Sequence, residues 1–403
     1  MTKTWLALVA IGSAVLVPQT GWAQMSNDTV KIGVLTDMNG PYADNTGVGT
    51  VLATQMAIDD FGGKINGKAI EIVSADHQNK PDVGASIARK WADTEGVDVI
   101  VDVVGSAVAF AVQNVAAEKN RVMLNVGSGA ADLTGPACTP VSVQWAWDTY
   151  SFGGILGKAL VKRGLDTFFF IAVDYAFGAQ LERDMTVALE QAGGKRIGGV
   201  RHPFGTTDFS SYLLQAQSSK AKVIAIANAG NDQANTVKQG AEFGIRKSGQ
   251  EFAAIVAARE VKAIGLPVAQ GLLAPTSWYW DLDDETRAFS KRFQEKRGGM
   301  PSEFQAGAYS AVLHYLKAVQ AAGTDEAKAV VRKMKELPIA DMYARHAKLR
   351  EDGRMVHDMY LVQAKAPAES KSDWDVLKVL ATVPGDEAFR PMAEGKCPLV
   401  KKP

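Results

Sequence analysis

Two short segments in the first half of the chain place hydrogen-bond donors next to small residues. Ser106 follows Gly105 at the expected start of a helix, where free backbone N–H groups favour an anion. The next expected strand is followed by four small residues that let the backbone approach a bound carboxylate, namely Gly127, Ser128, Gly129 and Ala130. Both segments therefore suit a carboxylate, unless Ser106 only caps its helix and Ser128 only forms a turn.

Further candidates follow other expected strands. Charged and amide side chains near the middle of the chain include Asn231, Asp232, Arg259 and Glu260. The alternative is that each charged residue among these lies on the surface, in contact with solvent. The tyrosines Tyr42, Tyr150 and Tyr175 offer rings that favour a flat or apolar ligand if they face a binding site, and otherwise pack in the core.

Catalytic and metal-binding patterns are missing from the sequence. No G-x-S-x-G motif occurs, and Gly127-Ser-Gly129 lacks the third glycine of a dinucleotide fingerprint. The S-x-x-K match at 219–222 precedes an expected strand, where a polar turn explains it. The five histidines are scattered and no CxxC pair occurs. We therefore expect no enzyme activity, no metal site and no cofactor.

The elements that position these residues alternate between short apolar runs and amphipathic stretches. The first run predicts strands at 31–35, 69–73, 97–104 and 121–126, with helices between them. A second run predicts strands at 167–173, 196–201, 222–227 and 251–257. Such a βαβα pattern predicts an α/β protein with two parallel sheets flanked by helices, and a ligand cleft between the two lobes.

The last third of the chain is mainly helical and must return to an existing lobe. Helices are expected at 283–296, 303–322 and 325–337, and closing strands at 358–364 and 375–380. Three connections, near 141–145, 272–277 and 347–356, would cross between the lobes. We expect lobe one to comprise 24–143 and 275–350, lobe two to comprise 144–274 and 351–383, and a tail at 384–403 to return to lobe one.

The first residues predict export from the cytoplasm. Lys3 precedes an apolar run at 5–17, and Gly21-Trp22-Ala23 resembles a cleavage site, which predicts a signal peptide removed after Ala23. The alternative, an uncleaved anchor, needs roughly 18 or more apolar residues. An oxidising compartment favours a disulfide between the two cysteines, Cys138 and Cys397, over two isolated thiols.

The charge of the chain excludes a class of partners. Lys plus Arg and Asp plus Glu each number 44, so no global field marks a nucleic-acid binder.

Six segments in this order resemble a known family, the type I periplasmic solute-binding proteins of ABC importers, in the leucine/isoleucine/valine-binding branch. The matching segments are Ile32–Tyr42, Gly62–Gly67, Val104–Val108, Ala131–Thr134, Asp174–Gly178 and Gln305–Tyr309. The resemblance covers nearly the whole mature chain. It implies two Rossmann-like lobes joined by a three-crossing hinge, which close on a small molecule and present it to a membrane permease.

The resemblance also implies a ligand and its contacts. The ligand would be a small hydrophobic carboxylate, either a branched-chain amino acid or an aromatic acid, bound by a periplasmic protein that we expect to be monomeric. Ser106 and the segment 127–130 occupy the positions that hold the ligand carboxylate, with Gly129 where a hydroxyl residue is common. Glu260 or Asp232 would pair with a ligand ammonium. A ligand-sensing protein of the same fold is the alternative, and a secreted enzyme is a more distant one.

Overall fold

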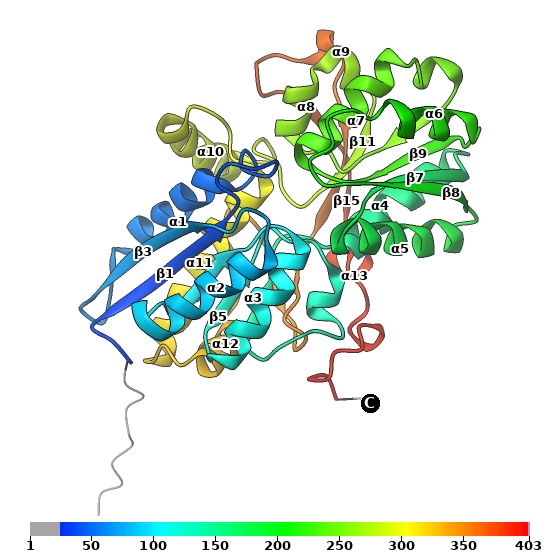
Figure 1. Ribbon diagram of the computed structural model, residues 1–403. Coiled ribbons are helices and arrows are strands. Elements are labelled where there is room, and N and C mark those ends of the chain that lie inside the picture. The colour runs from blue at the N-terminus through cyan, green and yellow to red at the C-terminus, as the bar shows by residue number, and fades with distance from the viewer. Residues whose placement is uncertain (1–24, 402–403) are drawn as a thin grey trace, which may run out of the picture.

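The computed structural model describes residues 25–401, which form two lobes that each contain a parallel β-sheet (Figure 1). The signal peptide expected at 1–23 and its cleavage site lie outside these residues. Among the helices between residues 25 and 401, none has the length and apolar character needed to cross a membrane.

Lobe one contains a six-stranded sheet. Its strands in spatial order are β2 (Lys64–Ile65), β3 (Lys68–Asp76), β1 (Thr29–Thr36), β4 (Val99–Asp102), β5 (Val122–Asn125) and β6 (Ser142–Gln144). Only β2 runs antiparallel to its neighbour. Leu35 pairs with Asp102, Asp102 with Asn125, and Asn125 with Gln144. The loops after β1, β4, β5 and β6 therefore meet at one edge of the sheet.

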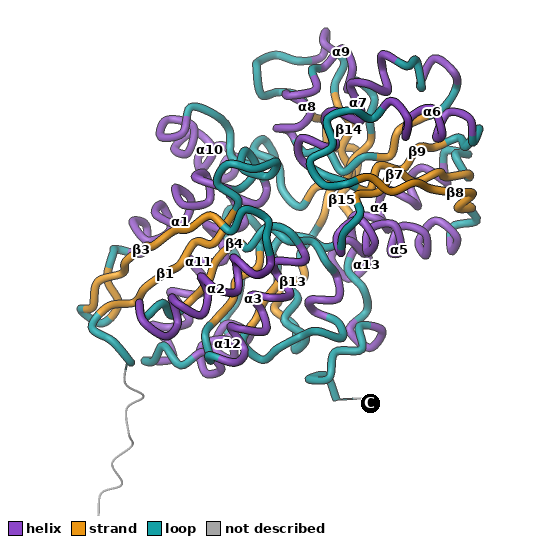
Figure 2. Tube along the Cα trace, in the orientation of Figure 1, coloured by secondary structure: helices purple, strands orange, loops and turns teal. Residues whose placement is uncertain are grey.

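Helices cover both faces of this sheet (Figure 2). Val99 and Val101 of β4 pack in one core cluster, whereas Ile100 between them packs in another with residues of α3, as the alternation of side chains along a strand requires. The helices of lobe one are α1 (Gly47–Phe61), α2 (Pro81–Lys90), α3 (Ser106–Glu118), α10 (Asp284–Arg297), α11 (Glu303–Ala322) and α12 (Ala327–Glu336).

Lobe two repeats this arrangement on a smaller sheet. Its parallel strands in spatial order are β10 (Glu251–Ala253), β9 (Val223–Ala227), β7 (Thr167–Val173) and β8 (Lys195–His202). Its helices are α4 (Thr149–Lys162), α5 (Ala176–Gln191), α6 (Ser210–Ser218), α7 (Gly230–Glu242), α8 (Ala258–Ile264) and α9 (Leu266–Ala269). The two predicted α/β lobes are confirmed.

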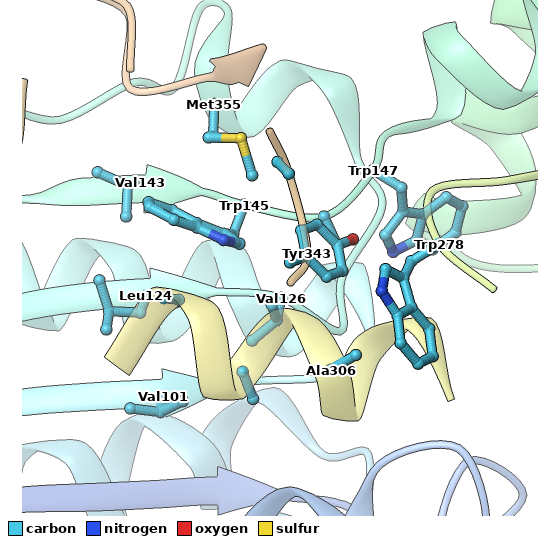
Figure 3. Close-up of a cluster of buried hydrophobic side chains, with 14 of the residues drawn as sticks. Val101, Leu124, Val126, Val143, Trp145, Trp147, Trp278, Ala306, Tyr343 and Met355 are labelled. Carbon is cyan, nitrogen blue, oxygen red and sulfur yellow. The ribbon is translucent and has the colours of Figure 1, made fainter. Parts of the chain in front are cut away.

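Three segments pass between the lobes. They follow β6, β11 (Leu273–Thr276) and the pair β12 (Lys348–Leu349) and β13 (Met355–Val356). Strand β11 forms a three-stranded antiparallel sheet with β14 (Met359–Ala364) and β15 (Leu377–Val383), and α13 (Gly385–Ala388) follows. Figure 3 shows aromatic side chains from the first two of these segments, Trp145, Trp147 and Trp278, together with Tyr343 from the stretch before β12, near α11.

Several predicted elements differ from the observed ones. The apolar run 97–104 predicts one strand, but β4 ends at Asp102, because positive φ values of 81° at Asp102 and 54° at Val103 turn the chain out of the extended conformation. Strand β10 likewise ends at Ala253 rather than Ala257. Ser106 does not cap α3: Gly105 is the N-cap residue, and Ser106 is the first helical residue.

The expected disulfide between Cys138 and Cys397 is confirmed, with 5.6 Å between their Cα atoms. It ties the C-terminal segment to the loop before β6. Arg390 in the same segment donates to the carbonyl of Ala131 at 2.9 Å, and its own carbonyl accepts from Arg350 at 2.8 Å. The end of the chain is therefore anchored to lobe one.

We expect a Cys138→Ser, Cys397→Ser double variant to lose about 2–5 kcal/mol of unfolding free energy, because the closed loop restricts the unfolded chain. Urea unfolding at 25 °C measures this, and wild type with reductant should match the variant. If oxidised wild type, unfolded without reductant, reacts with two equivalents of a thiol reagent, the disulfide does not form.

Candidate functional site

A cavity of about 520 Å³, partly open to solvent, lies between the facing edges of the two lobes. Loops after β1, β4 and β5 line one side, and loops after β7, β9 and β10 line the other. Most of the wall is aromatic, from Tyr42, Trp147, Phe152, Tyr175, Phe177 and Phe304. Trp147 contacts Phe152 and Phe304 with ring centroids 4.6 and 5.7 Å apart. The cavity therefore suits a ligand with an apolar portion.

The lobe-one wall contains the N-terminus of α3. Gly105 and Ser106 line the cavity together with Gly127. Gly105 has a φ of 89°, and a Cβ there would lie 2.1 Å from Oδ1 of Asn79, so no other residue fits. Its conformation lets α3 begin at the cavity with its first N–H groups free to bind an anion.

Ser128 lies behind this wall rather than on it. Its hydroxyl donates to Oγ of Ser106 at 3.1 Å, and its backbone N–H donates to Oδ1 of Asn125 at 3.1 Å. With Ser128 as donor, the hydroxyl proton of Ser106 remains available to a bound anion. Of these two serines, Ser106 is the one that lines the cavity.

Gly129 and Ala130 also lie outside the cavity wall. A Cβ on Gly129 would lie 2.5 Å from the indole ring of Trp147, so the absence of a side chain there seats Trp147 in the wall. The side chain of Ala130 packs in the core beside α3. The indole Nε1 of Trp147 has no acceptor among residues 25–401, which leaves a buried donor next to the ligand space.

The lobe-two wall contributes a buried carboxyl group. Glu260, at the start of α8, is 7% exposed, and burial raises its pKa above the ordinary range. Its Oε2 accepts from the N–H of Ala257 at 3.1 Å, and its Oε1 accepts from Nδ2 of Asn45 in lobe one. Arg259 does not neutralise it, because the guanidinium donates to Asp44 Oδ1 at 2.6 Å and to the Met300 carbonyl at 2.7 Å.

The other acidic candidate does not line the cavity. Asp232 is buried at the start of α7, where it accepts from the N–H of Gly205 at 3.0 Å, and burial raises its pKa to about 6. Asn231 beside it is exposed. The structure therefore brings Glu260, but not Asp232 or Asn231, to the cavity wall.

Two of the three predicted tyrosines meet across the cleft. The hydroxyl of Tyr42, in the loop after β1, forms a hydrogen bond with the hydroxyl of Tyr175, before α5. Burial raises the pKa of both phenols, so both stay neutral. Tyr150 lies elsewhere, in a separate cavity lined by α4, α5 and β15. The lobes are thus in contact around the cavity, as in a closed form.

Other residues of the wall were not among the sequence-based candidates, notably Asn45, Trp147, Phe177, Glu303 and Phe304. Phe177 lies within a segment that carries the family resemblance, and Phe304 directly precedes another. Glu303 lies between Ser302 and Gln305, which form the capping box at the start of α11. An acidic residue at a helix start is ordinarily explained by its favourable interaction with the helix dipole.

The charged side chains on the cavity wall are carboxyl groups. Among residues 25–401, those that line the cavity include no Lys, Arg or His, and they include two buried carboxyl groups, Glu260 and Glu303. Within residues 25–401, no three His, Cys, Asp or Glu side chains are grouped as metal ligands. A ligand would match this wall with an anionic group at the N-terminus of α3, a cationic group at the two carboxyl groups and an apolar portion against the aromatic rings.

Known proteins are similar to this chain in sequence and fold. A periplasmic binding protein from Burkholderia mallei is 48% identical, covers 93% of this chain and 100% of its own, and superposes with a TM-score of 0.91. A branched-chain amino acid ABC transporter periplasmic ligand-binding protein from Burkholderia xenovorans is 42% identical, with 92% and 100% coverage and a TM-score of 0.83. The Leu/Ile/Val-binding protein homolog 1 of Brucella melitensis is 25% identical over 83% of this chain and 89% of its own.

The sequence profile of the periplasmic binding proteins matches residues 29–371, which is most of the chain. The two lobes, the three crossings and the cavity between them agree with that match. The resemblance found in the sequence is thereby confirmed, and the chain belongs to the periplasmic binding protein family.

Proposed function

We propose that this protein is the solute-binding receptor of an ABC importer and that it captures a hydrophobic amino acid. The observation that carries this proposal is the cavity itself, with a helix N-terminus on one wall, a buried carboxyl group on the other and aromatic rings between them. The Burkholderia xenovorans protein, whose name includes branched-chain amino acids, supports the same ligand class.

The α-carboxylate of the ligand would bind at lobe one. The first N–H groups of α3 and the hydroxyl of Ser106 are donors, and Gly127 leaves room beside them. Charge-assisted hydrogen bonds to such donors are stronger than neutral ones. Ser128 would act through Ser106, because it donates to the Ser106 oxygen.

The ammonium group of the ligand would bind at Glu260. A buried carboxylate costs free energy, and an ammonium beside it offsets that cost. This requirement favours an amino acid over an aromatic acid without an amine. Such an acid brings a second anion into the cavity and no cation for Glu260. Phe177, Ile255 and Phe304 would surround the apolar side chain, whether branched or aromatic.

The setting of the receptor follows from its family. Periplasmic binding proteins bind small molecules and work with membrane permeases, so the family is one of receptors rather than enzymes. We place the mature protein in the periplasm as a monomer, beginning at Gln24, with lobe one comprising 24–143 and 275–350 and lobe two comprising 144–274 and 351–383. No feature of the cavity favours a sensing role over delivery to a permease.

Glu260→Gln should weaken leucine or valine binding about 10- to 150-fold, because a charged hydrogen bond is worth roughly 1.5–3 kcal/mol. Benzoate, which has no amine, should bind the variant at least as well as wild type. Calorimetric titration of both proteins with leucine, valine, phenylalanine and benzoate measures the difference.

Glu242→Gln is the matched control, because Glu242 lies exposed at the end of α7. It should leave every affinity unchanged. The amino-acid assignment is wrong if benzoate binds wild type tightly while the three amino acids do not. Leucine binding by Glu260→Gln as tight as by wild type would instead show that Glu260 does not hold the ammonium.

The lobes should separate when the ligand is absent, because a ligand held by both walls prefers the closed form. Small-angle scattering should show a smaller radius of gyration at saturating leucine. Identical scattering profiles with and without bound leucine would argue against hinged closure.

Tyr175→Phe removes the hydroxyl that forms a hydrogen bond with Tyr42 across the cleft, so the affinity of this variant for leucine should fall about 5-fold, or ~1 kcal/mol.

A further inference from the structure

Glu303 is a buried carboxyl group held rigidly by the segment that crosses between the lobes. It is the first residue of α11 and is 4% exposed. Its Oε2 accepts three hydrogen bonds, from the N–H and the hydroxyl of Ser277 at 2.6 Å each and from the hydroxyl of Thr276 at 2.8 Å. Tyr343 in turn donates to the Ser277 hydroxyl at 2.8 Å.

The second oxygen of Glu303 is free. No donor within residues 25–401 reaches Oε1, and Oε1 keeps accessible surface, unlike the enclosed unpaired atoms elsewhere in the protein. Glu303 lines the cavity. Three donors fix one oxygen, so the orientation of the carboxyl is set before any ligand arrives and the other oxygen is left to accept from one.

Glu260 differs from Glu303 in this respect. Both of its oxygens already accept hydrogen bonds from the protein, Oε1 from Asn45 and Oε2 from the N–H of Ala257. An ammonium has three donors and needs more than one acceptor to satisfy them after burial. Glu303 is the carboxyl group of the cavity wall that retains an unused acceptor atom.

The titratable groups around Glu303 leave its negative charge without a neutralising partner. Glu260 and Tyr343 are the titratable groups that act on it, and Arg259 is held by Asp44 and the Met300 carbonyl. Burial, and secondarily the negative charge of Glu260, raise the pKa of Glu303 to about 7, although its three hydrogen bonds oppose the shift. Two carboxyl groups thus share one cavity whose wall supplies no positive side chain.

We propose that Oε1 of Glu303 accepts a hydrogen bond from the ligand ammonium and that Glu303 is a specificity-determining residue that selects amine-bearing ligands over carboxylates without an amine. This inference rests on the proposed function. It adds a contact from lobe one and the crossing segment, so that the ammonium lies between Glu303 and Glu260 and is held by both lobes.

Proton exchange on binding gives this contact a distinct signature. Burial raises the pKa of Glu303 to about 7 in the closed form. A ligand ammonium stabilises the carboxylate and lowers that pKa, whereas a carboxylate ligand without an amine stabilises the protonated form and raises it. Both complexes form from the same unliganded protein, so near pH 7 the benzoate complex should hold more protons than the leucine complex. The ratio of leucine affinity to benzoate affinity should therefore fall as the pH decreases through 7.

Calorimetry of wild type with L-leucine and with benzoate at pH 7, in phosphate and in Tris buffers, measures the protons exchanged. We expect benzoate to take up a substantial fraction of one proton more than leucine does. Glu303→Gln should bind leucine at least 10-fold more weakly and lose this difference, while its benzoate affinity stays within about 3-fold of wild type. Ser277→Ala removes one donor to Oε2, which raises the pKa of Glu303, so the midpoint of the difference should shift to higher pH.

Asp284→Asn is the control, because it removes an acidic side chain from the first turn of the neighbouring helix α10, where Asp284 is fully exposed. It should change neither affinity nor proton exchange. If Glu303→Gln misfolds, the difference in proton uptake between benzoate and leucine on wild type still decides the question.

The possible results separate this inference from the proposed function. Equal proton exchange on leucine and on benzoate binding by wild type, or unchanged leucine affinity in a folded Glu303→Gln variant, overturns the role of Glu303 alone. If wild type binds benzoate but none of leucine, valine and phenylalanine, the amino-acid assignment fails as well, and with it the role of Glu303.

Discussion

The position of the cavity depends on how the first and third crossings are held together, and the buried guanidinium of Arg354 joins them from the hairpin β12–β13 that leads into the third crossing. Arg354 is 1% exposed and donates to the carbonyl oxygens of Trp145, Trp147 and Met355 at 2.6, 2.7 and 2.9 Å. Burial lowers its pKa to about 10, so it remains charged at neutral pH. A buried charge is tolerated only when it is well hydrogen-bonded, so the third crossing cannot move away from the first without a large cost.

This constraint also shapes the ligand site. The carbonyl of Trp147 is fixed by Arg354, and its indole ring fits against Gly129 and between Phe152 and Phe304. The first crossing is therefore both a hinge element and part of the cavity wall. A ligand that contacts Trp147 would touch the first crossing directly, and this packing would couple binding to the hinged closure proposed above.

Closure joins incomplete halves. Lobe one supplies the N-terminus of α3, lobe two supplies Glu260, and the contacts between Tyr42 and Tyr175 and between Asp44 and Arg259 bridge the cleft. Gly230 allows the close approach, because a Cβ there would lie 2.4 Å from the carbonyl oxygen of Pro41. Under the proposed function, a ligand ammonium offsets the cost of burying these carboxyl groups on closure, since burial without a partner disfavours their charged forms.

The sequence alone determined the two α/β lobes and the three crossings, because hydrophobic periodicity is a local signal. It also determined the disulfide, because an exported chain with two cysteines leaves one pairing. The loops that surround the cavity were predicted from the ends of the parallel strands. Tyr42, Ser106, Gly127, Tyr175 and Glu260 were predicted in this way and do line the cavity. Only the tertiary structure decided which way each loop residue faces. Ser128 lies behind Ser106, Tyr150 lines another cavity, and Glu303 reaches the wall from a helix start 43 residues beyond Glu260. These placements depend on contacts between distant segments, such as that of Ser277 with Glu303, which no spacing along the chain records.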